Sequence, residues 1–387
     1  MIIMRESTPH DDRQQPSPFA HWMLREIYEQ PGTLSATVDH YVQGDVFQVD
    51  TCASALVWLA SIQSKLVIAA SGSSRHAGLF AELLIEDLSG IAVDVEYASE
   101  YCYRSEKSLT DAAVMVISQS GETADTLAAL RKANLAGHAT LAITNVEDST
   151  MAREATASLP TLAGRERAVP ATKSFTAQLL NLYLLALMSA EVRAAIDSTE
   201  LGARLSEVAQ LPAKIEKQLK GWDDAMREVA GHYRAAKNFL FLGRGLHYSI
   251  AREGALKLKE SAYLHAEGYP SGELKHGPNA LVAEGTPLVM IATVDRSDVD
   301  SQLRYEKVVQ LMRDMRAQGA SVLAIANLGD DAVGELASHT VYVEECREAL
   351  LAICEVIPLQ LLASWMAVNN GIDVDHPRNL TKAVLAE

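Results

Sequence analysis

A strand–turn–helix pattern that occurs twice along the chain constrains its fold more than any other feature. In the first copy, the apolar runs at residues 66–70 and 114–117 each end in a polar turn that leads into a helical pattern. In the second copy, residues 239–242 and 288–292 occupy the corresponding places. Short strands rich in Val and Ile that alternate with helices are typical of a parallel sheet covered on both faces. The sequence therefore predicts an α/β protein with two related units.

Matching segments support this duplication and suggest the domain limits. Residues 141–145 read Leu-Ala-Ile-Thr-Asn, and residues 323–327 read Leu-Ala-Ile-Ala-Asn. A first helix is expected from His21 to Gln30, ending at the following proline, and the helix that opens the second unit is expected from Ser249 to Ala266. We expect a lead-in and helix at 1–45, a first unit at 46–190, a helical connector at 191–236, a second unit at 237–366 and a tail at 367–387.

Composition and charge exclude several classes of function. The chain has 387 residues, 48% of them hydrophobic, which is enough for two domains with buried cores. No apolar run approaches the ~20 residues that span a bilayer, and the N-terminal residues contain no apolar signal core. The four cysteines have no metal-ligand spacing, which favours a reducing cytoplasm. A net charge of −16 argues against binding to nucleic acids or anionic membranes, because both need a basic face.

The turn at residues 118–123 (SQSGET) is the main candidate for a ligand site. Ser118, Gln119, Ser120 and Thr123 would stand at the carboxyl end of a parallel strand, where open sheets bind their ligands. Their hydroxyl and amide groups, together with the N–H groups of the next helix, can hold an anion. The turn lacks the GxxxxGK[ST] arrangement, so a phosphate monoester without a metal fits better than a nucleotide.

A second hydroxyl-bearing turn lies at residues 71–74, after the neighbouring strand, and contains Ser73 and Ser74. The alternative is that both turns are polar loops whose hydroxyls only cap helices, a very common use of Ser and Thr. Two such turns at one sheet edge favour a phosphate-binding site over simple helix capping.

Two further segments carry groups that could perform chemistry. Lys257 and Glu260 are three residues apart on a predicted helix, so they share one face. A solvated ion pair is the alternative, but the surrounding leucines indicate burial. A loop rich in Gly and Pro at residues 268–278 contains His276, which could simply be exposed. Carboxylate and imidazole groups near a sugar are what ring opening and proton transfer require. From its position near the C-terminus alone, Lys382 would be expected to be a charged residue on the surface.

Together these segments resemble the isomerase half of glutamine–fructose-6-phosphate aminotransferase, which is built from paired sugar isomerase (SIS) domains. The resemblance implies two tandem SIS domains, each a flavodoxin-like parallel sheet flanked by helices, and an ordered C-terminal tail that closes the active site. It runs from about residue 21 to residue 387 and rests on the segments 118–123 (SQSGET), 171–176 (ATKSFT), 253–260 (EGALKLKE), 272–278 (GELKHGP) and 377–380 (PRNL).

The resemblance also implies roles for individual residues. Glu260 would move a proton between C1 and C2, His276 would open the sugar ring from a neighbouring subunit, and Lys382 would meet the open-chain carbonyl as a Schiff base. The active site would thus be shared within a homodimer and would need no metal and no cofactor. The substrate-binding residues would be Ser73, Ser74, Ser118, Gln119, Ser120 and Thr123 around the phosphate, Val169 and Thr381 through backbone groups, and Lys257 beside the carbonyl.

The chain also departs from that family. The aminotransferase has an upstream glutaminase domain with a nucleophilic cysteine, whereas only about twenty residues, none of them cysteine, precede the match here. We therefore expect no glutamine hydrolysis. Residues 165–167, Pro170 and Thr381 differ near the expected sugar position. Glucosamine-6-phosphate deaminases of the SIS type similarly lack a glutaminase domain and share the hydroxyl turn.

The expected function is an enzyme that interconverts glucosamine 6-phosphate with fructose 6-phosphate and ammonia, mainly in the deaminating direction and independently of glutamine. One alternative is a plain aldose–ketose phosphosugar isomerase. The other is a non-catalytic regulator that binds a phosphosugar, although a regulator would need only the phosphate site.

Overall fold

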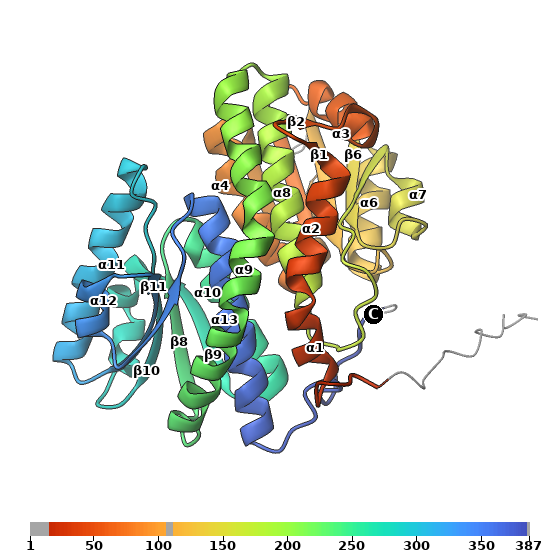
Figure 1. Cartoon of the computed structure of the whole chain (residues 1–387). Helices are drawn as coiled ribbons and strands as arrows, with labels where there is room; N and C mark the ends of the chain where they lie inside the picture. The colour runs from red at the N-terminus through yellow and green to blue at the C-terminus, as the bar shows by residue number, and fades with distance from the viewer. Residues whose placement is uncertain (1–14, 106–110, 385–387) are drawn as a thin grey trace, which may run out of the picture.

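Two parallel sheets dominate the structure, a computed structural model that describes residues 15–105 and 111–384 (Figure 1). The first fourteen residues of the expected lead-in and the last three of the tail lie outside the described residues. The first sheet contains β3 (Lys65–Ala70), β4 (Ala92–Tyr97), β5 (Ala112–Ser118), β6 (Thr140–Thr144) and β7 (Ala157–Pro160). The second sheet contains β8 (Asn238–Gly243), β9 (His265–Pro270), β10 (Pro287–Ala292), β11 (Ser321–Asn327) and β12 (His339–Val343).

The two sheets have the same strand order. The first runs β4-β3-β5-β6-β7 and the second β9-β8-β10-β11-β12, and neighbouring strands within each sheet are parallel. In chain order both therefore read 2-1-3-4-5, which is the flavodoxin-like arrangement. The predicted fold class, two α/β units with parallel sheets, is confirmed.

Helices cover both faces of each sheet, which explains why the central strands are apolar throughout. Every residue of β5, β6 and β10 is buried. Such strands read as continuous hydrophobic runs because neither face meets water. The helices of the first unit are α3 (Val49–Ser61), α4 (Gly72–Ser89), α5 (Ala98–Tyr101), α6 (Ala124–Leu135), α7 (Thr150–Glu154) and α8 (Lys173–Val192). Those of the second are α10 (Leu246–Ala262), α11 (Val299–Ala317), α12 (Asp331–Leu336) and α13 (Glu348–Asn369).

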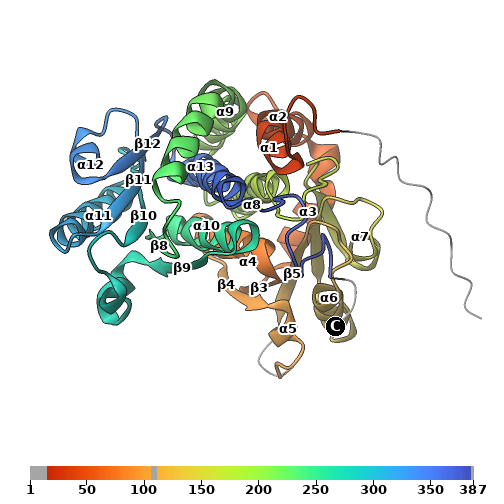
Figure 2. The ribbon, with the colours of Figure 1, turned by 90° about the horizontal axis from the view of Figure 1, so that it is seen from below.

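Four helices pack between the two sheets and form the centre of the molecule. Figure 2 shows α4, α8, α10 and α13 in this position, and the pairs α4–α8, α4–α10 and α10–α13 are in contact. The expectation that no apolar segment approaches membrane-spanning length was wrong, because helices α8 and α13 are long and apolar enough to cross a membrane. However, 89% of the apolar window of each is buried inside the protein. They are therefore core helices that lie between the two sheets.

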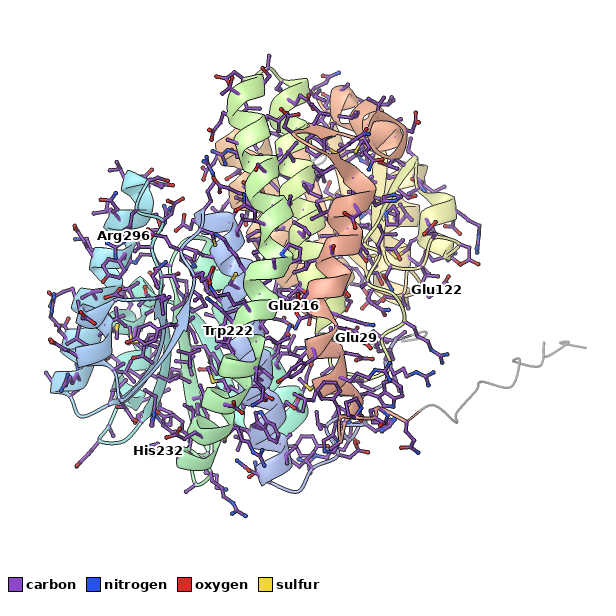
Figure 3. All side chains as sticks on the ribbon, in the orientation of Figure 1. Glu29, Glu122, Glu216, Trp222, His232 and Arg296 are labelled. Atoms are coloured by element: carbon purple, nitrogen blue, oxygen red, sulfur yellow. The ribbon has the colours of Figure 1, made fainter. Side chains whose placement is uncertain are left out.

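The remaining helices wrap the outside of this centre. Helix α1 (Trp22–Tyr28) and helix α2 (Gln30–Tyr41) precede the small hairpin β1 (Val42–Gln43) and β2 (Val46–Phe47). Helix α9 (Ser198–His232) contacts α2, α13 and β12, so it touches both units. Its buried Trp222, labelled in Figure 3, donates a 2.8 Å hydrogen bond from Nε1 to the Tyr342 carbonyl in β12.

Two local expectations were wrong. The proline at position 31 does not end the first helix region but begins α2, because the first helical turn tolerates its missing N–H. The helix that opens the second unit ends at Ala262 instead of Ala266, since Tyr263 turns into a left-handed conformation with φ 55°. The residues after it form β9, an edge strand paired with β8 that the loop interpretation missed.

Because α10 packs closely against its neighbours, we expect two helical glycines to respond differently to substitution by alanine. A Cβ on Gly254 would lie 2.7 Å from Leu359 Cδ1 and 2.9 Å from Phe241 Cε1, whereas a Cβ on Gly221 in α9 would meet no atom within 4 Å. We expect Gly254→Ala to lower the free energy of unfolding by about 1–3 kcal/mol through overpacking. Gly221→Ala should raise it by up to about 1 kcal/mol through helix propensity. Denaturant unfolding of both variants measures these free energies. Equal changes in the two variants would contradict the close packing around Gly254.

Candidate functional site

The candidate site lies where the strand order of the first sheet reverses. Strands β3 and β5 are neighbours, and the chain leaves β3 into α4 and β5 into α6. The turns at residues 71–74 and 118–123 therefore meet at the carboxyl edge of these two strands. In open α/β sheets this is where a crevice opens for ligands.

A cavity of about 280 Å³ occupies this crevice, and it brings together residues from five separated parts of the chain. Of the predicted site residues, His276 alone is not part of its wall. The others all line it: Ser73, Ser74, Ser118, Gln119, Ser120, Thr123, Val169, Lys257, Glu260, Thr381 and Lys382.

The hydroxyl groups of the second turn are organised by hydrogen bonds among themselves. Ser118 Oγ lies 2.9 Å from Thr123 Oγ1 and accepts a 3.2 Å hydrogen bond from the Gly121 N–H. Ser120 Oγ accepts a 3.2 Å bond from the Glu122 N–H. These bonds hold three hydroxyls at the N-terminus of α6, where an anion is stabilised by N–H groups and by the helix dipole.

Gly121 is required for this turn to fit. Its φ is +65°, and a Cβ there would lie 2.1 Å from Ser149 Oγ and 2.8 Å from Thr144 Oγ1. The backbone at Gly121 therefore lies so close to β6 and α7 that no side chain fits at this position. Its carbonyl also accepts a 3.1 Å hydrogen bond from the Met151 N–H.

The buried ammonium of Lys257, which lines the same cavity, stands among three partners. Its Nζ lies 2.6 Å from Glu260 Oε2, 3.4 Å from Glu253 Oε1 and 3.2 Å from Ser73 Oγ. Burial lowers the pKa of Lys257, but Glu260 and Glu253 outweigh this and raise it above its usual range. The lysine therefore stays charged beside Glu260. The solvated ion-pair alternative does not fit, because Lys257 is 1% exposed.

Glu253 is a buried carboxylate beside Lys257, outside the cavity lining, that sequence reasoning did not select. It accepts a 2.8 Å hydrogen bond from Ser73 Oγ and lies 2.8 Å from His76 Nδ1. Burial raises its pKa, and the charge of Lys257 with these hydrogen bonds lowers it below the usual value. Its position four residues before Lys257, on the same helix face, was the signal that could have found it.

The C-terminal tail closes one side of the cavity. The Val169 N–H donates to the Asp375 carbonyl at 3.0 Å, and the Ala124 N–H, first in α6, donates to the Val384 carbonyl at 3.0 Å. Lys382 Nζ donates to the Ala168 carbonyl at 2.8 Å and to the Glu166 carboxylate. The described part of the tail is thus docked.

Glu166 is a second buried carboxylate that the sequence did not single out. It accepts hydrogen bonds from the Thr172 N–H at 2.9 Å, the Ser174 N–H at 3.1 Å and Ser174 Oγ at 2.6 Å. Burial raises its pKa, but Lys382 and these donors outweigh burial and lower the pKa to about 2. It is therefore an ionised partner that fixes the position of Lys382. Its only signal in the sequence is an acidic residue between two arginines, which reads as a surface loop.

A third buried carboxylate supports the same loop from α1. Glu26 accepts hydrogen bonds from the backbone N–H groups of Arg167 and Ala168. Burial raises the pKa of Glu26 to about 8, with a further contribution from the charge of Glu166. The loop at residues 165–169 is therefore held by N-terminal and C-terminal segments together.

Thr126 is another cavity residue that sequence reasoning missed. It is buried, and its Oγ1 has no hydrogen-bond partner within the described residues. It lines the same cavity one helical turn after Thr123. A buried hydroxyl without a partner is a donor and acceptor available to a ligand.

His276 is exposed at the end of the short 3-10 helix η2 (Ser271–His276), which follows β9. It does not line the cavity formed by its own chain. Neighbouring residues anchor the segment: Leu274 is buried, and Lys275 Nζ lies 2.6 Å from Asp314 Oδ2.

Among the described residues, one group offers metal-ligating atoms within 4.8 Å of one another: His21, Asp373 and Asp375. Both carboxylate oxygens of Asp375 already accept 2.8 Å hydrogen bonds, from the Trp22 and Met23 N–H groups. The group therefore caps the N-terminus of α1 and joins it to the tail.

Comparisons with known proteins agree with the fold described above. The SIS domain family model matches residues 59–188 and 232–370. A glutamine–fructose-6-phosphate aminotransferase (isomerizing) from Chlorobaculum tepidum is 42% identical over 371 residues, covering 95% of this chain and 59% of the relative. A Clostridium acetobutylicum protein of the same description is 40% identical, with the same coverage. The chain thus spans about three-fifths of the length of these relatives.

Solved structures give the same picture. The C-terminal domain of glucosamine-fructose-6-phosphate aminotransferase from Francisella tularensis superposes with a TM-score of 0.86 at 33% identity, covering 94% of this chain and 100% of that one. A glucosamine-6-phosphate deaminase from Thermotoga maritima superposes with a TM-score of 0.69 at 25% identity, covering 94% and 99%. Because the SIS domain family model matches two segments, residues 59–188 and 232–370, which contain the two sheets, the chain belongs to the SIS domain family.

Proposed function

We propose that the chain is a sugar-phosphate isomerase of the SIS family that converts glucosamine 6-phosphate and water to fructose 6-phosphate and ammonia, reversibly and without glutamine. One observation carries the proposal: the hydroxyl turns that can hold an anion (the anion cradle), the Lys257–Glu260 pair and Lys382 on the docked tail all line one cavity. A regulator that only binds a phosphosugar would need the cradle alone.

The binding step uses the hydroxyl turns. Ser118, Ser120, Thr123 and the N–H groups of α6 would hold the phosphate, while Ser74, whose Oγ accepts a 3.1 Å bond from Gln178 Nε2, would complete the ring of donors. Because the chain carries a net charge of −16, these local groups must supply the attraction for an anionic substrate. The residues near Val169 and Thr381 would then orient the sugar.

The chemical step would be a proton transfer next to a carbonyl. His276, supplied by a second copy of the chain, would open the ring. Glu260 would take the proton from C2 of the open-chain aldehyde and deliver it to C1, which leaves an imine at C2. Lys257, permanently charged, would stabilise the negative charge that develops on the sugar oxygen. Lys382 would exchange with the imine nitrogen to release ammonia, and hydrolysis of the resulting Schiff base would give the ketose.

These roles predict a cytoplasmic homodimer that needs no metal and no cofactor. Ammonia is the partner that distinguishes the proposal from a plain aldose–ketose isomerase, because the latter would release none. Incubation with a panel of hexose 6-phosphates and amino-sugar 6-phosphates, with ammonia and ketose measured together, separates the two.

The anion cradle predicts a loss of affinity when its hydroxyls are removed. In the double variant with Ser118→Ala and Thr123→Ala, each substitution should cost about 1 kcal/mol or more of binding free energy, because each removes a hydrogen bond to a charged group. Binding of fructose 6-phosphate to the double variant should therefore weaken about 30-fold or more. Isothermal titration calorimetry measures this, with Ser206→Ala, an exposed hydroxyl on α9, as the control. Unchanged affinity in the double variant would place the phosphate elsewhere.

The shared active site predicts complementation between inactive variants. His276→Ala and Glu260→Gln should each be inactive alone, yet regain part of the activity when mixed and allowed to exchange subunits, because one site of the mixed dimer then carries both native groups. Activity after proven exchange is the measurement. A monomer in sedimentation, or an exchanged mixture without activity, would refute a histidine from a second copy.

The proton-transfer role predicts that Glu260→Gln separates binding from turnover. Glutamine keeps the shape and the hydrogen-bonding capacity but removes the base, so turnover should fall by about 10²–10⁴-fold or more while affinity stays nearly unchanged. Incorporation of solvent deuterium at the exchanging carbon reports proton abstraction even when product release is slow. Glu306→Gln, exposed on α11, is the matched control.

If Glu260→Gln incorporated solvent deuterium as fast as the parent protein, Glu260 would be only a structural ion-pair partner. If the parent protein shows neither exchange nor turnover with any hexose phosphate, the regulator alternative replaces the enzyme.

A further inference from the structure

The second sheet has a crevice at the same topological position as the first. Strands β8 and β10 are neighbours and are followed by α10 and, after a turn, by α11, as β3 and β5 are followed by α4 and α6. A cavity of about 780 Å³ lies there, lined among others by Gly245, Asp295 and Asp298 from the two turns. No hydroxyl turn like that at residues 118–123 is present in the sequence at this place, where residues 293–296 read Thr-Val-Asp-Arg.

A cluster of anion donors nevertheless surrounds a carboxylate in the wall of this crevice. Arg304 and Glu348 line the cavity, and His247 and Ser301 contact Glu348 from outside the lining. Glu348 Oε1 lies 3.1 Å from His247 Nε2, and it accepts a 3.1 Å hydrogen bond from Ser301 Oγ and a 2.9 Å bond from Arg304 Nε. Arg304 Nη2 bonds the other oxygen, Oε2. The donors come from α10 and α11, and Glu348 is the first residue of α13.

The cluster is buried and its charges are balanced. His247 is 3% exposed and Glu348 is 7% exposed. Burial lowers the pKa of His247, but Glu355, 2.9 Å from its Nδ1, and Glu348 outweigh burial and raise it to about 10. Burial raises the pKa of Glu348, and the donors His247 and Arg304 lower it to about 2. At neutral pH the crevice therefore holds a buried imidazolium, a guanidinium and a carboxylate in direct contact.

The backbone of the crevice is also adapted to these donors. Gly245 has φ +60°, and a Cβ there would lie 2.8 Å from Arg304 Cδ. Glycine at this position lets the arginine side chain cross the turn after β8 and reach Glu348.

We infer that His247, Ser301 and Arg304 form a second anion-binding cradle, suited to a phosphate group, and that Glu348 fills it permanently. Asp295 and Asp298 at its rim would repel a free anion, and Asp298 Oδ2 lies 3.9 Å from Arg304 Nη2. A tethered carboxylate overcomes this repulsion because its effective concentration is high. Each chain therefore offers one phosphate site to its substrate, in the first unit, and uses the second cradle to lock α10, α11 and α13 together.

The test removes the internal carboxylate and asks whether an external anion takes its place. Ser118→Ala with Thr123→Ala serves as the background, so that the first crevice contributes little. In this background Glu348→Ala should lower the thermal midpoint, and inorganic phosphate should restore it. Above the dissociation constant, each tenfold increase in phosphate should reduce the unfolding equilibrium constant about tenfold. Chloride at equal ionic strength is the reference.

Matched variants make the outcome decisive. Glu345→Ala removes a nearby exposed carboxylate and should gain no phosphate-dependent stabilisation. Glu348→Gln fills the cradle without charge, so it should be destabilised but not rescued. A folded Glu348→Ala variant that responds equally to phosphate and chloride overturns the inference. If Glu348→Ala folds poorly, its refolding yield in phosphate against chloride decides: a higher yield in phosphate supports the cradle, and equal yields overturn it.

Discussion

Burying the ammonium group of Lys257 is the constraint on which the candidate crevice of the first unit depends. A charge with 1% exposure costs several kcal/mol to desolvate, so it persists only with close partners. Those partners come from both units: Glu253 and Glu260 from its own helix and Ser73 from the turn after β3. Helix α10 can therefore occupy only a narrow range of positions against α4, and that position places Glu260 in the lining of the cavity that the hydroxyl turn also lines.

The same principle governs the tail. Glu166 is buried and ionised, so it needs a cation, and Lys382 on the tail supplies it. Glu26 from α1 then holds the backbone of the loop that carries Glu166. Segments from both ends of the described chain are thus tied to one loop by carboxylates that water cannot reach. Removing any of these partners would leave an uncompensated buried group, which is why the tail is docked.

Much of this arrangement could be predicted from the sequence, and the reasons are physical. Central strands such as β5 and β10 are buried on both faces and are therefore visible in the sequence as apolar runs, and the hydroxyl turn after β5 is visible as a polar cluster at the end of such a run. The edge strand β9 was missed because its half-exposed residues, including Gly268 and Pro270, resemble a loop. Glu166 and Glu348 were missed because a single acidic residue looks the same whether it is solvated or buried. Their partners, Lys382 and His247, lie more than a hundred residues away and meet them only in the folded chain.

The two units complete each other in a reciprocal way. Helix α10 of the second unit carries Lys257 and Glu260 into the crevice of the first, and helix α4 of the first unit lines the cavity of the second with Leu84 and Asp87. Because each cavity takes part of its lining from the other unit, neither unit could be lost or exchanged by recombination without altering the other. The two units are therefore inherited as one.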